Sequence, residues 1–508
     1  MAVHDNISPV TPVRELYPYQ EEAIERIFAT FTRMKFGKNI LFQLPTGGGK
    51  TVIFSEITRR YIAQHGKKVL ILTHRIELSR QIARTLESTG VSNKVIDSTV
   101  WQLDDQEQHQ CFVAMVETLN NRLSDNRNYI GDIGLVIVDE AHYNSFRKIF
   151  HYFDEVTILG VTATPLSSNR QLPLNDNYHH LITGQSISDL IREQYLSDAT
   201  TYSFDVNTRS LRVGITGDFT VSSSERLYSS PQMIERLLQA YEEKARGSKT
   251  LIFNSGIETS RLVGNAFEKA GYPVRHLDST FSSNDRQEVI RWFRATKDGI
   301  LTSVGILTHG FDEPDVDTII LNRATRSITL YHQMIGRGSR KTPKKNHFNI
   351  IDLGNNALRL GLWQDPIDWH FAFKYPEIFI EQSIREAEPE PEALYYEMPP
   401  DLLARFSNRL DLLEFEMPVA YQYALKSGRK ANEAIDLSLA NHVDLIASNA
   451  NSYDEALELA GLLKEEIMYR LRQYVACLTK ATDSYLHWLV QRYQRKLRHQ
   501  LLIKMSME

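Results

Sequence analysis

Short apolar runs alternate with amphipathic stretches along the first two hundred residues of the chain. The apolar runs that we interpret as strands are 39–44, 69–72, 111–115, 135–138 and 157–161. Strands that are apolar at nearly every position are buried on both faces, as in a parallel sheet that helices cover on each side. The pattern therefore predicts an α/β domain built on a parallel sheet.

The same alternation returns in the middle of the chain, after a polar segment rich in serine and threonine that extends to Pro231. We interpret that segment as a linker with some strand. The second set of predicted strands is 250–253, 274–277, 300–304, 318–321 and 348–353. These runs predict a second α/β domain, and no short-period repeat relates it to the first.

The last third of the chain has a different pattern of residues. Glutamates and prolines interleave between Glu386 and Glu392, which is typical of an extended, solvated connector. Everything after Asp401 has the pattern of helices. The predicted fold class is therefore α/β, with two tandem sheet domains followed by a C-terminal all-α domain.

Composition and charge narrow the class of protein. The chain has 508 residues, of which 42% are hydrophobic and 24% charged, so it can build several cores. Its 58 Lys and Arg against 63 Asp and Glu give a net charge of −5, so only a local basic surface could bind nucleic acid. No leader pattern opens the chain, and no apolar run approaches the roughly 18–20 residues of a membrane span. We expect a cytoplasmic bacterial protein that contacts no membrane.

The number and spacing of the cysteines also favour an intracellular location. Cys111 and Cys477 are the only cysteines and lie far apart in the chain. Two isolated cysteines cannot form a cysteine-based zinc cluster or a disulfide framework. We therefore expect a reducing compartment and no zinc.

A phosphate-binding loop is predicted where the first strand runs into a helix, at Leu44–Thr51. Backbone amides at the glycines can surround phosphate oxygens, Lys50 can reach the β and γ phosphates, and the Thr51 hydroxyl can ligate Mg²⁺. Leu44 stands where the strict pattern has its first glycine, so this loop is a variant. The predicted nucleotide-binding residues of the loop are Thr46, Gly47, Gly48, Gly49, Lys50 and Thr51. The cofactors that they imply are ATP and Mg²⁺.

Two adjacent carboxylates follow the apolar run 135–138. Asp139 suits a Mg²⁺ contact through water, and Glu140 suits a general base that takes a proton from the attacking water. Acid pairs at strand ends are common, but a phosphate loop earlier in the same domain makes a metal-nucleotide site the better interpretation.

The run Asp139–His142 reads as the box that names the DEAH-type helicases, and the chain resembles this DEAD/DEAH-box superfamily 2 over about residues 14–355. Further segments resemble the family's motifs in order: Leu16–Gln20 the Gln motif, Thr73–Arg75 motif Ia, Thr162–Pro165 motif III, Ile252–Asn254 motif IV, Leu307–Pro314 motif V and Gln333–Arg340 motif VI. The resemblance implies two tandem RecA-like domains with ATP in the cleft between them.

The sequence patterns and the resemblance together give the predicted domain bounds. They are 1–205 for the ATP-binding domain, 206–245 for a linker, 246–375 for the helicase C-terminal domain, 376–400 for the acidic connector and 401–508 for a helical accessory domain.

Several residue roles follow only from the resemblance. Gln20 would read adenine, and Gly310 and Asp312 would link the nucleotide to the nucleic-acid track. Arg337 and Arg340 would act as arginine fingers from the second domain. With Gln333, which would position the attacking water or the γ-phosphate, the predicted catalytic set is Lys50, Glu140, Gln333, Arg337 and Arg340.

Nucleic-acid contacts are predicted in two places. In the motor, the family's motifs imply contacts at Thr73, His74, Arg75, Asn254 and Thr308. Near the C-terminus, one helical stripe is apolar and another is basic, and the basic stripe includes Arg492, Arg495 and Lys496. A solvated face on a bundle helix is the alternative for that stripe and stays open.

Within superfamily 2, motifs V and VI look like those of RadD-like, Rad25/Ssl2-like and restriction-subunit helicases. The Thr162-Ala163-Thr164 motif differs from the Ser-Ala-Thr usual in RNA-remodelling DEAD-box enzymes. We therefore favour DNA over RNA as the substrate. RadD-like proteins carry a cysteine cluster after the motor, which this chain lacks, so that resemblance extends to the motor alone.

Three functions remain open at this point. The first is an ATP-driven DNA helicase or translocase that works in repair. The second is a motor subunit of an antiphage-defence or restriction complex, in which residues 401–508 dock a protein partner. The third is a nucleotide-dependent clamp that hydrolyses little ATP.

Overall fold

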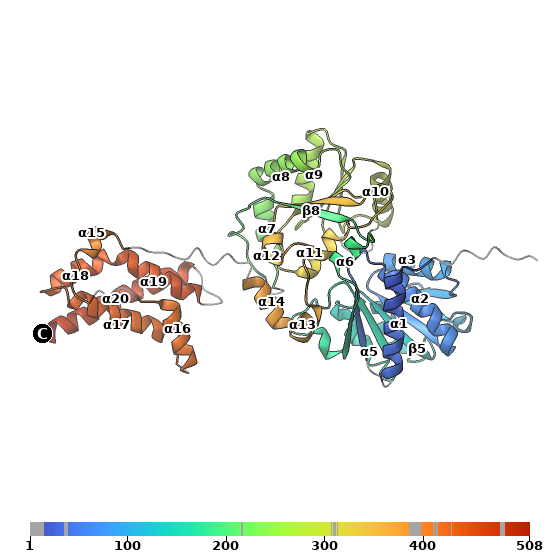
Figure 1. Ribbon diagram of the computed structural model, residues 1–508, viewed down its shortest axis with the longest axis horizontal. Coiled ribbons are helices and arrows are strands. Elements are labelled where there is room, and N and C mark those ends of the chain that lie inside the picture. The colour runs from blue at the N-terminus through green and yellow to red at the C-terminus, as the bar shows by residue number, and fades with distance from the viewer. Residues whose placement is uncertain are drawn as a thin grey trace, which may run out of the picture. The chain divides into compact units, whose positions relative to one another are not determined.

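The computed structural model describes residues 15–34, 39–214, 217–305, 307, 311, 313–385, 398–409, 412, 415–427, 429–477 and 483–507. The chain divides into two compact units, Met1–Ala387 and Glu388–Glu508. The first unit contains two parallel sheets flanked by helices, and the second is helical (Figure 1). The predicted α/β fold class is confirmed.

The first sheet has seven parallel strands in the order β3-β4-β2-β5-β6-β1-β7. The strands are β1 Ile40–Gln43, β2 Lys68–Thr73, β3 Asn93–Ile96, β4 Cys111–Met115, β5 Ile133–Asp139, β6 Thr157–Thr162 and β7 His180–Thr183. Helices α1 Pro18–Arg33, α2 Lys50–His65 and α3 Ile76–Ser88 pack on one face, and α4 Val116–Asp125 and α5 Arg147–Phe150 on the other. Ile40 and Phe42 face the first layer and Leu41 the second, so β1 is apolar throughout.

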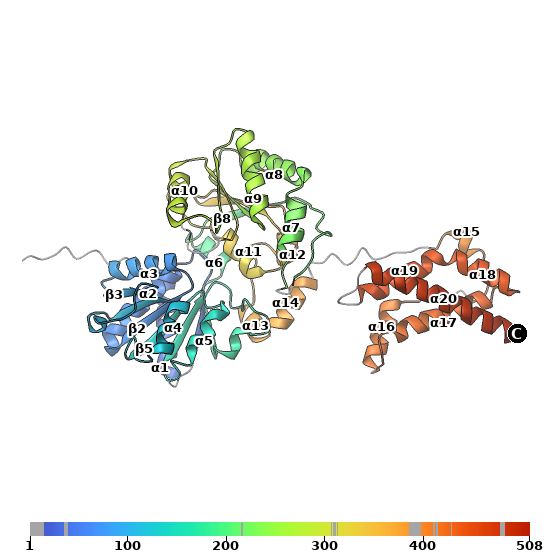
Figure 2. The same ribbon diagram turned by 180° about the vertical axis from the view of Figure 1, so that it is seen from behind.

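The second sheet has six parallel strands in the order β10-β11-β9-β12-β13-β8. The strands are β8 Asp198–Ser203, β9 Thr250–Asn254, β10 Val274–Leu277, β11 Ile300–Ser303, β12 Thr318–Asn322 and β13 His347–Asp352. Helices α7 Val221–Tyr228, α8 Pro231–Lys244 and α9 Ile257–Lys269 share a core on one face, and α10 Ser283–Ala295 and α11 Ile328–Ile335 pack on the other (Figure 2).

The structure moves the predicted boundary between these domains. Strand β8 lies within the segment 1–205 that we assigned to the first domain, yet it pairs in parallel with β13 of the second sheet. The predicted linker 206–245 contains α7 and α8, whose Tyr228 and Leu237 are fully buried in the second core. Which sheet β8 joins depends on the path of the chain after α6 Ile187–Arg192. The local pattern of polar and apolar residues does not predict that path.

The chain returns to the first domain after the second sheet. Beyond α12 Asn356–Leu360, helix α13 Trp369–Lys374 packs against β7, and Trp369 and Phe373 lie against the core of the first domain. Helix α14 Pro376–Arg385 then occupies the start of the predicted extended connector 376–400. Residues 386–397 of that connector lie outside the described residues.

The C-terminal unit contains the predicted helices. They are α15 Pro400–Leu403, α16 Met417–Lys426, α17 Glu433–Ala447, α18 Tyr453–Leu462, α19 Lys464–Ala476 and α20 Asp483–Met507. The predicted apolar stripe of α20 is buried in the core of this unit at Leu489, Tyr493, Leu497 and Leu501. Among the helices that the structure describes, none has the length and apolarity needed to cross a bilayer.

Candidate nucleotide-binding cleft

The predicted phosphate loop connects β1, near one edge of the first sheet, to the first turn of α2. Gly47 and Gly49 have left-handed φ angles of 90° and 83°. A Cβ at Gly49 would lie 2.5 Å from Gln20 Nε2, and one at Gly47 would lie 2.7 Å from Ser339 Oγ. Both positions therefore need glycine, because of the backbone angle and because other segments approach closely.

The Gln motif lies directly against this loop. The Tyr19 hydroxyl donates to the Gly48 carbonyl oxygen at 2.9 Å, and Gln20 Oε1 accepts from the Tyr17 amide at 3.0 Å. Gln20 lines the same cavity as Lys50 and Thr51. This placement is consistent with a base-reading role for Gln20, which stays a prediction.

Strand β5 delivers the two predicted carboxylates to its carboxyl end. Asp139 is buried, and its Oδ1 accepts from the Glu140 amide at 3.0 Å. Glu140 has a left-handed φ of 52°, which turns the chain sharply at the end of the strand. Burial, and next the neighbouring Glu140 charge, raise the pKa of Asp139 well above its usual range, while Lys50 acts in the opposite direction.

The donor set at this point fits a magnesium ion. Thr51 and Asp139 line one cavity and offer a hydroxyl and a carboxylate oxygen, the ligand type that Mg²⁺ prefers. A bound cation would also offset the cost of ionising the buried Asp139. Thr51 and Asp139 therefore remain our candidates for holding the ion.

We expect Asp139→Asn to stabilise the nucleotide-free protein in EDTA. Because the pKa of Asp139 is raised in the folded state, the folded protein is most stable below the ordinary Asp pKa, where this carboxyl is protonated in both states. That stability is lost as pH rises through the raised pKa. The variant should therefore melt higher than wild type at pH 8 and equally at pH 4, by roughly 2–4 °C for each kcal/mol relieved. Thermal melts across pH measure this, with the exposed Asp132→Asn as control. Parallel pH profiles for wild type and Asp139→Asn would contradict the assignment.

His142, the last residue of the DEAH box, connects Glu140 to the second domain. The Thr162 hydroxyl donates to the Thr164 carbonyl oxygen at 2.9 Å, so His142 Nδ1, 3.2 Å away, donates to Thr162 Oγ1. The same Nδ1 lies 3.4 Å from Glu140 Oε2. His142 Nε2 then accepts from Gln333 Nε2 at 3.3 Å. Burial lowers the pKa of His142, which favours this neutral form.

The second domain forms the opposite wall of the cleft. A Cβ at Gly336 would lie 2.6 Å from Thr46 Cβ, so motif VI packs on the phosphate loop. Arg337 Nη1 donates to the Phe311 carbonyl oxygen at 2.8 Å. The Thr164 hydroxyl of motif III donates to Thr329 Oγ1 at 2.8 Å across the two domains.

A cavity of about 390 Å³ opens between these walls. The predicted residues that line it are Gln20, Thr46, Gly47, Gly49, Lys50, Thr51, Asp139, Glu140, Arg337 and Arg340. Gln333 does not line this cavity. It is 3% exposed and contacts His142, so in this structure its side chain is not placed to touch the attacking water. The predicted residues Thr308, Gly310 and Asp312 lie outside the described residues.

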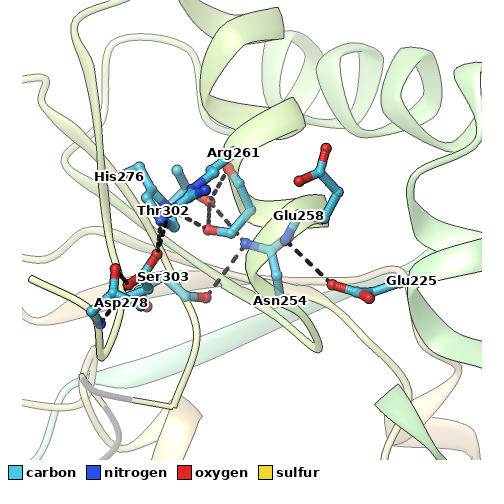
Figure 3. A network of polar contacts seen from close by, with 10 residues as sticks. Glu225, Asn254, Glu258, Arg261, His276, Asp278, Thr302 and Ser303 are labelled. Atoms are coloured by element: carbon cyan, nitrogen blue, oxygen red, sulfur yellow. Dashed lines mark hydrogen bonds and ion pairs between the residues drawn. The ribbon is translucent and has the colours of Figure 1, made fainter. Parts of the chain in front are cut away.

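The side chains of two predicted nucleic-acid contacts are buried and bonded within the protein, and their contact with nucleic acid stays a prediction. Thr73 is fully buried, and its Oγ1 is bonded to Ser79 Oγ at 2.8 Å. Asn254 is 1% exposed, donates to Thr302 Oγ1 at 2.8 Å and accepts from Asn322 Nδ2 at 2.7 Å. Figure 3 shows Asn254 within this internal network at the strand ends. Both side chains tie neighbouring segments together, because the strand ends that carry them are covered.

The other predicted contacts keep some exposure. The His74 ring lies against the Tyr143 ring, with centroids 4.3 Å apart and planes tilted by 36°, and Arg75 is half-buried. In the C-terminal unit, Lys496 pairs with Asp436 at 2.9 Å, and the Arg492 guanidinium lies 5.2 Å from the Trp488 ring. Arg495 is exposed. Their contacts with nucleic acid remain predictions.

Comparison with known families agrees with this geometry. Residues 14–167 match the family described as type III restriction enzyme, res subunit, and residues 230–342 match the helicase conserved C-terminal domain. The chain carries the two motor domains of a superfamily 2 helicase.

Relatives of the helicase motor come from phage, yeast and bacteria. A 51.5 kDa protein of Lactococcus phage (isolate 7-9) is 29% identical over 66% of this chain and 70% of its own length. A Saccharomyces cerevisiae protein named as the ATP-dependent helicase IRC3 is 31% identical over 66% of this chain and 51% of its own length. The Escherichia coli type I restriction enzyme EcoKI endonuclease subunit is 24% identical over 66% of this chain and 34% of its own length. The chain thus spans about half of the yeast relative and a third of the EcoKI subunit.

Solved structures agree on the fold. A fragment described as an HsdR subunit of a type I restriction enzyme from Vibrio vulnificus YJ016 has a TM-score of 0.54 and 21% identity, over 72% of this chain and 68% of that one. At this identity the likeness concerns the fold of the motor alone.

Proposed function

We propose that this protein is an ATP-driven translocase or helicase that acts on DNA. The observation that carries the proposal is the two-sided cleft, in which Lys50 and Glu140 of the first domain face the same cavity as Arg337 and Arg340 of the second. A site completed by both domains couples hydrolysis to their relative movement.

Each wall of the cleft has its own task in this proposal. Lys50 holds the β and γ phosphates, and Glu140 takes a proton from the attacking water. Arg337 and Arg340 stabilise charge on the phosphoryl oxygens. A bound Mg²⁺ ion, held by Thr51 and Asp139, would neutralise phosphate charge. His142 contacts both Glu140 and Gln333, so it couples changes at Glu140 to the position of the second domain.

DNA is favoured by the motif pattern and by the relatives. Restriction-enzyme subunits stand beside proteins named as the DNA helicases Hel308 and MPH1 among the matches, although the RNA helicase DBP3 is also there. A RadD-like or Rad25/Ssl2-like grouping, a repair role and a cytoplasmic location stay hypotheses of the same proposal.

The test is ATPase activity across a panel of single- and double-stranded DNA and RNA. We expect DNA to stimulate turnover severalfold over both the basal rate and the RNA arms. The panel is run on the full chain and on a chain ending at Ala387, where the first compact unit ends. Stronger stimulation by RNA than by any DNA would overturn the substrate assignment.

The restriction-enzyme relatives favour a second candidate, a motor subunit of a restriction or antiphage-defence complex. In that case residues 401–508 dock a protein partner. Copurification separates the two candidates: a stoichiometric partner that is lost when residues 388–508 are removed supports the subunit. DNA-stimulated unwinding by the isolated chain supports the autonomous enzyme.

A further inference from the structure

Helix α20 of the C-terminal unit has two opposite faces. Its apolar stripe is buried in the core of that unit. On the other side Trp488, Arg495 and Arg498 are exposed, and Arg492 is half-buried beside them. These four residues follow one another at intervals of three or four positions, which places them on one side of a helix. We call these four residues the α20 surface.

The cations of α20 differ in whether a carboxylate balances them. The helix contains five Lys and Arg and a single acidic residue, at its first position. Its two lysines pair with carboxylates of α17: Lys496 with Asp436, and Lys504 with Asp444. In the part of the chain that the structure describes, none of the three arginines of the α20 surface has a carboxylate at ion-pair distance. The α20 surface is therefore a positive strip on a protein whose net charge is −5.

An aromatic side chain lies among these arginines. Trp488 is 45% exposed, although burying an indole ring is favourable. Its ring stacks on Tyr485 with centroids 5.6 Å apart and planes at 27°, and the Arg492 guanidinium lies 5.2 Å from the Trp488 ring centroid. These contacts hold the exposed indole next to a guanidinium.

This combination suits a single strand of nucleic acid. Bases stack on exposed aromatic rings, and guanidiniums bind the phosphates that follow along the strand. The α20 surface extends for about 15 Å along the helix, which is long enough for several successive phosphates. A base can stack on Trp488 only when it is unpaired, so the indole favours a single strand over a duplex. An acidic protein segment could pair with the arginines but has no base to stack.

We propose that the α20 surface binds single-stranded DNA, with its arginines on backbone phosphates and Trp488 against a base. The proposal rests on the function proposed above for the class of ligand, and it adds a strand contact outside the two motor domains. It also decides against the solvated face that the sequence left open for this stripe. Such a contact raises the affinity for the strand and leaves the chemistry of the nucleotide cleft unchanged.

The first test removes charge from the α20 surface in the full chain. Arg495→Gln with Arg498→Gln is compared with Lys504→Gln, which removes a charge that Asp444 already balances on the same helix. Anisotropy of a fluorescent oligothymidylate measures affinity over a range of salt. We expect the double variant to bind about tenfold more weakly, with the slope of log affinity against log salt reduced by about 1.4. Lys504→Gln should match wild type in both quantities.

The second test separates base stacking from charge. Trp488→Ala should bind oligothymidylate about five- to tenfold more weakly and bind an abasic strand of the same length as wild type does. Trp488→Phe keeps a ring and should recover most of the loss. In ATPase assays all these variants should reach the wild-type kcat at saturating DNA, and the stacking and arginine variants should need more DNA for half-maximal stimulation.

The results distinguish failure of this proposal from failure of the proposed function. If wild type binds DNA while the arginine double variant and Trp488→Ala keep its affinity, the α20 assignment is overturned and the motor assignment stands. If wild type binds no nucleic acid, the proposed function fails as well. If the arginine variant binds more weakly but Trp488→Ala does not, the surface binds polyanions without reading bases, as an acidic protein segment would require, and the single-strand assignment is wrong. Arg495→Lys with Arg498→Lys keeps the charge and should be intermediate, which covers a Gln variant that does not fold.

Discussion

Arg337→Ala is expected to lower kcat for ATP hydrolysis by about 10³- to 10⁵-fold. Arg337 lines the nucleotide cavity from the second domain and is oriented by its bond to the Phe311 carbonyl oxygen. A planar guanidinium stabilises the charge spread over the transferring phosphoryl oxygens, and alanine leaves that charge unbalanced. Phosphate release measures the rate of hydrolysis. Binding of a fluorescent ATP analogue measures whether the first domain still binds nucleotide.

The control for Arg337→Ala is Arg236→Ala on the exposed side of α8, which should keep the wild-type rate. Turnover of Arg337→Ala near that of wild type would mean that the second domain does not complete the site. Both candidate functions share this expectation, because each needs a motor driven by closure of the cleft.

Glu140→Gln is expected to lower kcat by about 10²- to 10⁴-fold while ATP still binds. Glu140 is turned into the cleft by its left-handed backbone and lies 3.4 Å from His142 Nδ1. The amide has nearly the same shape but cannot accept the proton of the attacking water. Single-turnover hydrolysis and nucleotide binding separate the chemical step from affinity, with the exposed Glu155→Gln as control.

The same variant decides the clamp alternative. A clamp that works through nucleotide binding alone would keep its cellular function with Glu140→Gln, whereas a translocase would lose it. Preserved hydrolysis in Glu140→Gln would instead show that another group acts as the base.

Much of the motor could be predicted from local sequence. The ten apolar runs that we interpreted as strands are strands β1, β2, β4, β5, β6, β9, β10, β11, β12 and β13. Lys50 and Asp139 meet in one cavity because parallel strands bring their carboxyl ends to the same edge of a sheet. That rule needs only the strand order along the chain, so the site was predictable.

Long-range pairing was not predictable in the same way. Strand β8 joins the second sheet, α8 buries Leu237 there, and α13 returns to the first domain. Each of these placements depends on packing against a surface that is formed by residues far away in the sequence. Thr73 and Asn254 carry polar side chains at strand ends, and only the tertiary structure shows that both side chains are buried.

By itself the sequence determined two parallel sheets, a phosphate loop and a carboxylate pair, because these depend on residue spacing within short segments. The tertiary structure alone decided that His142 joins Glu140 to Gln333 and that Arg170 and Arg326 share a cavity. The pairs that cross the domain interface, His142 with Gln333 and Arg170 with Arg326, lie 156 positions or more apart. The pattern of residues within a short segment carries no information about contacts between positions so far apart.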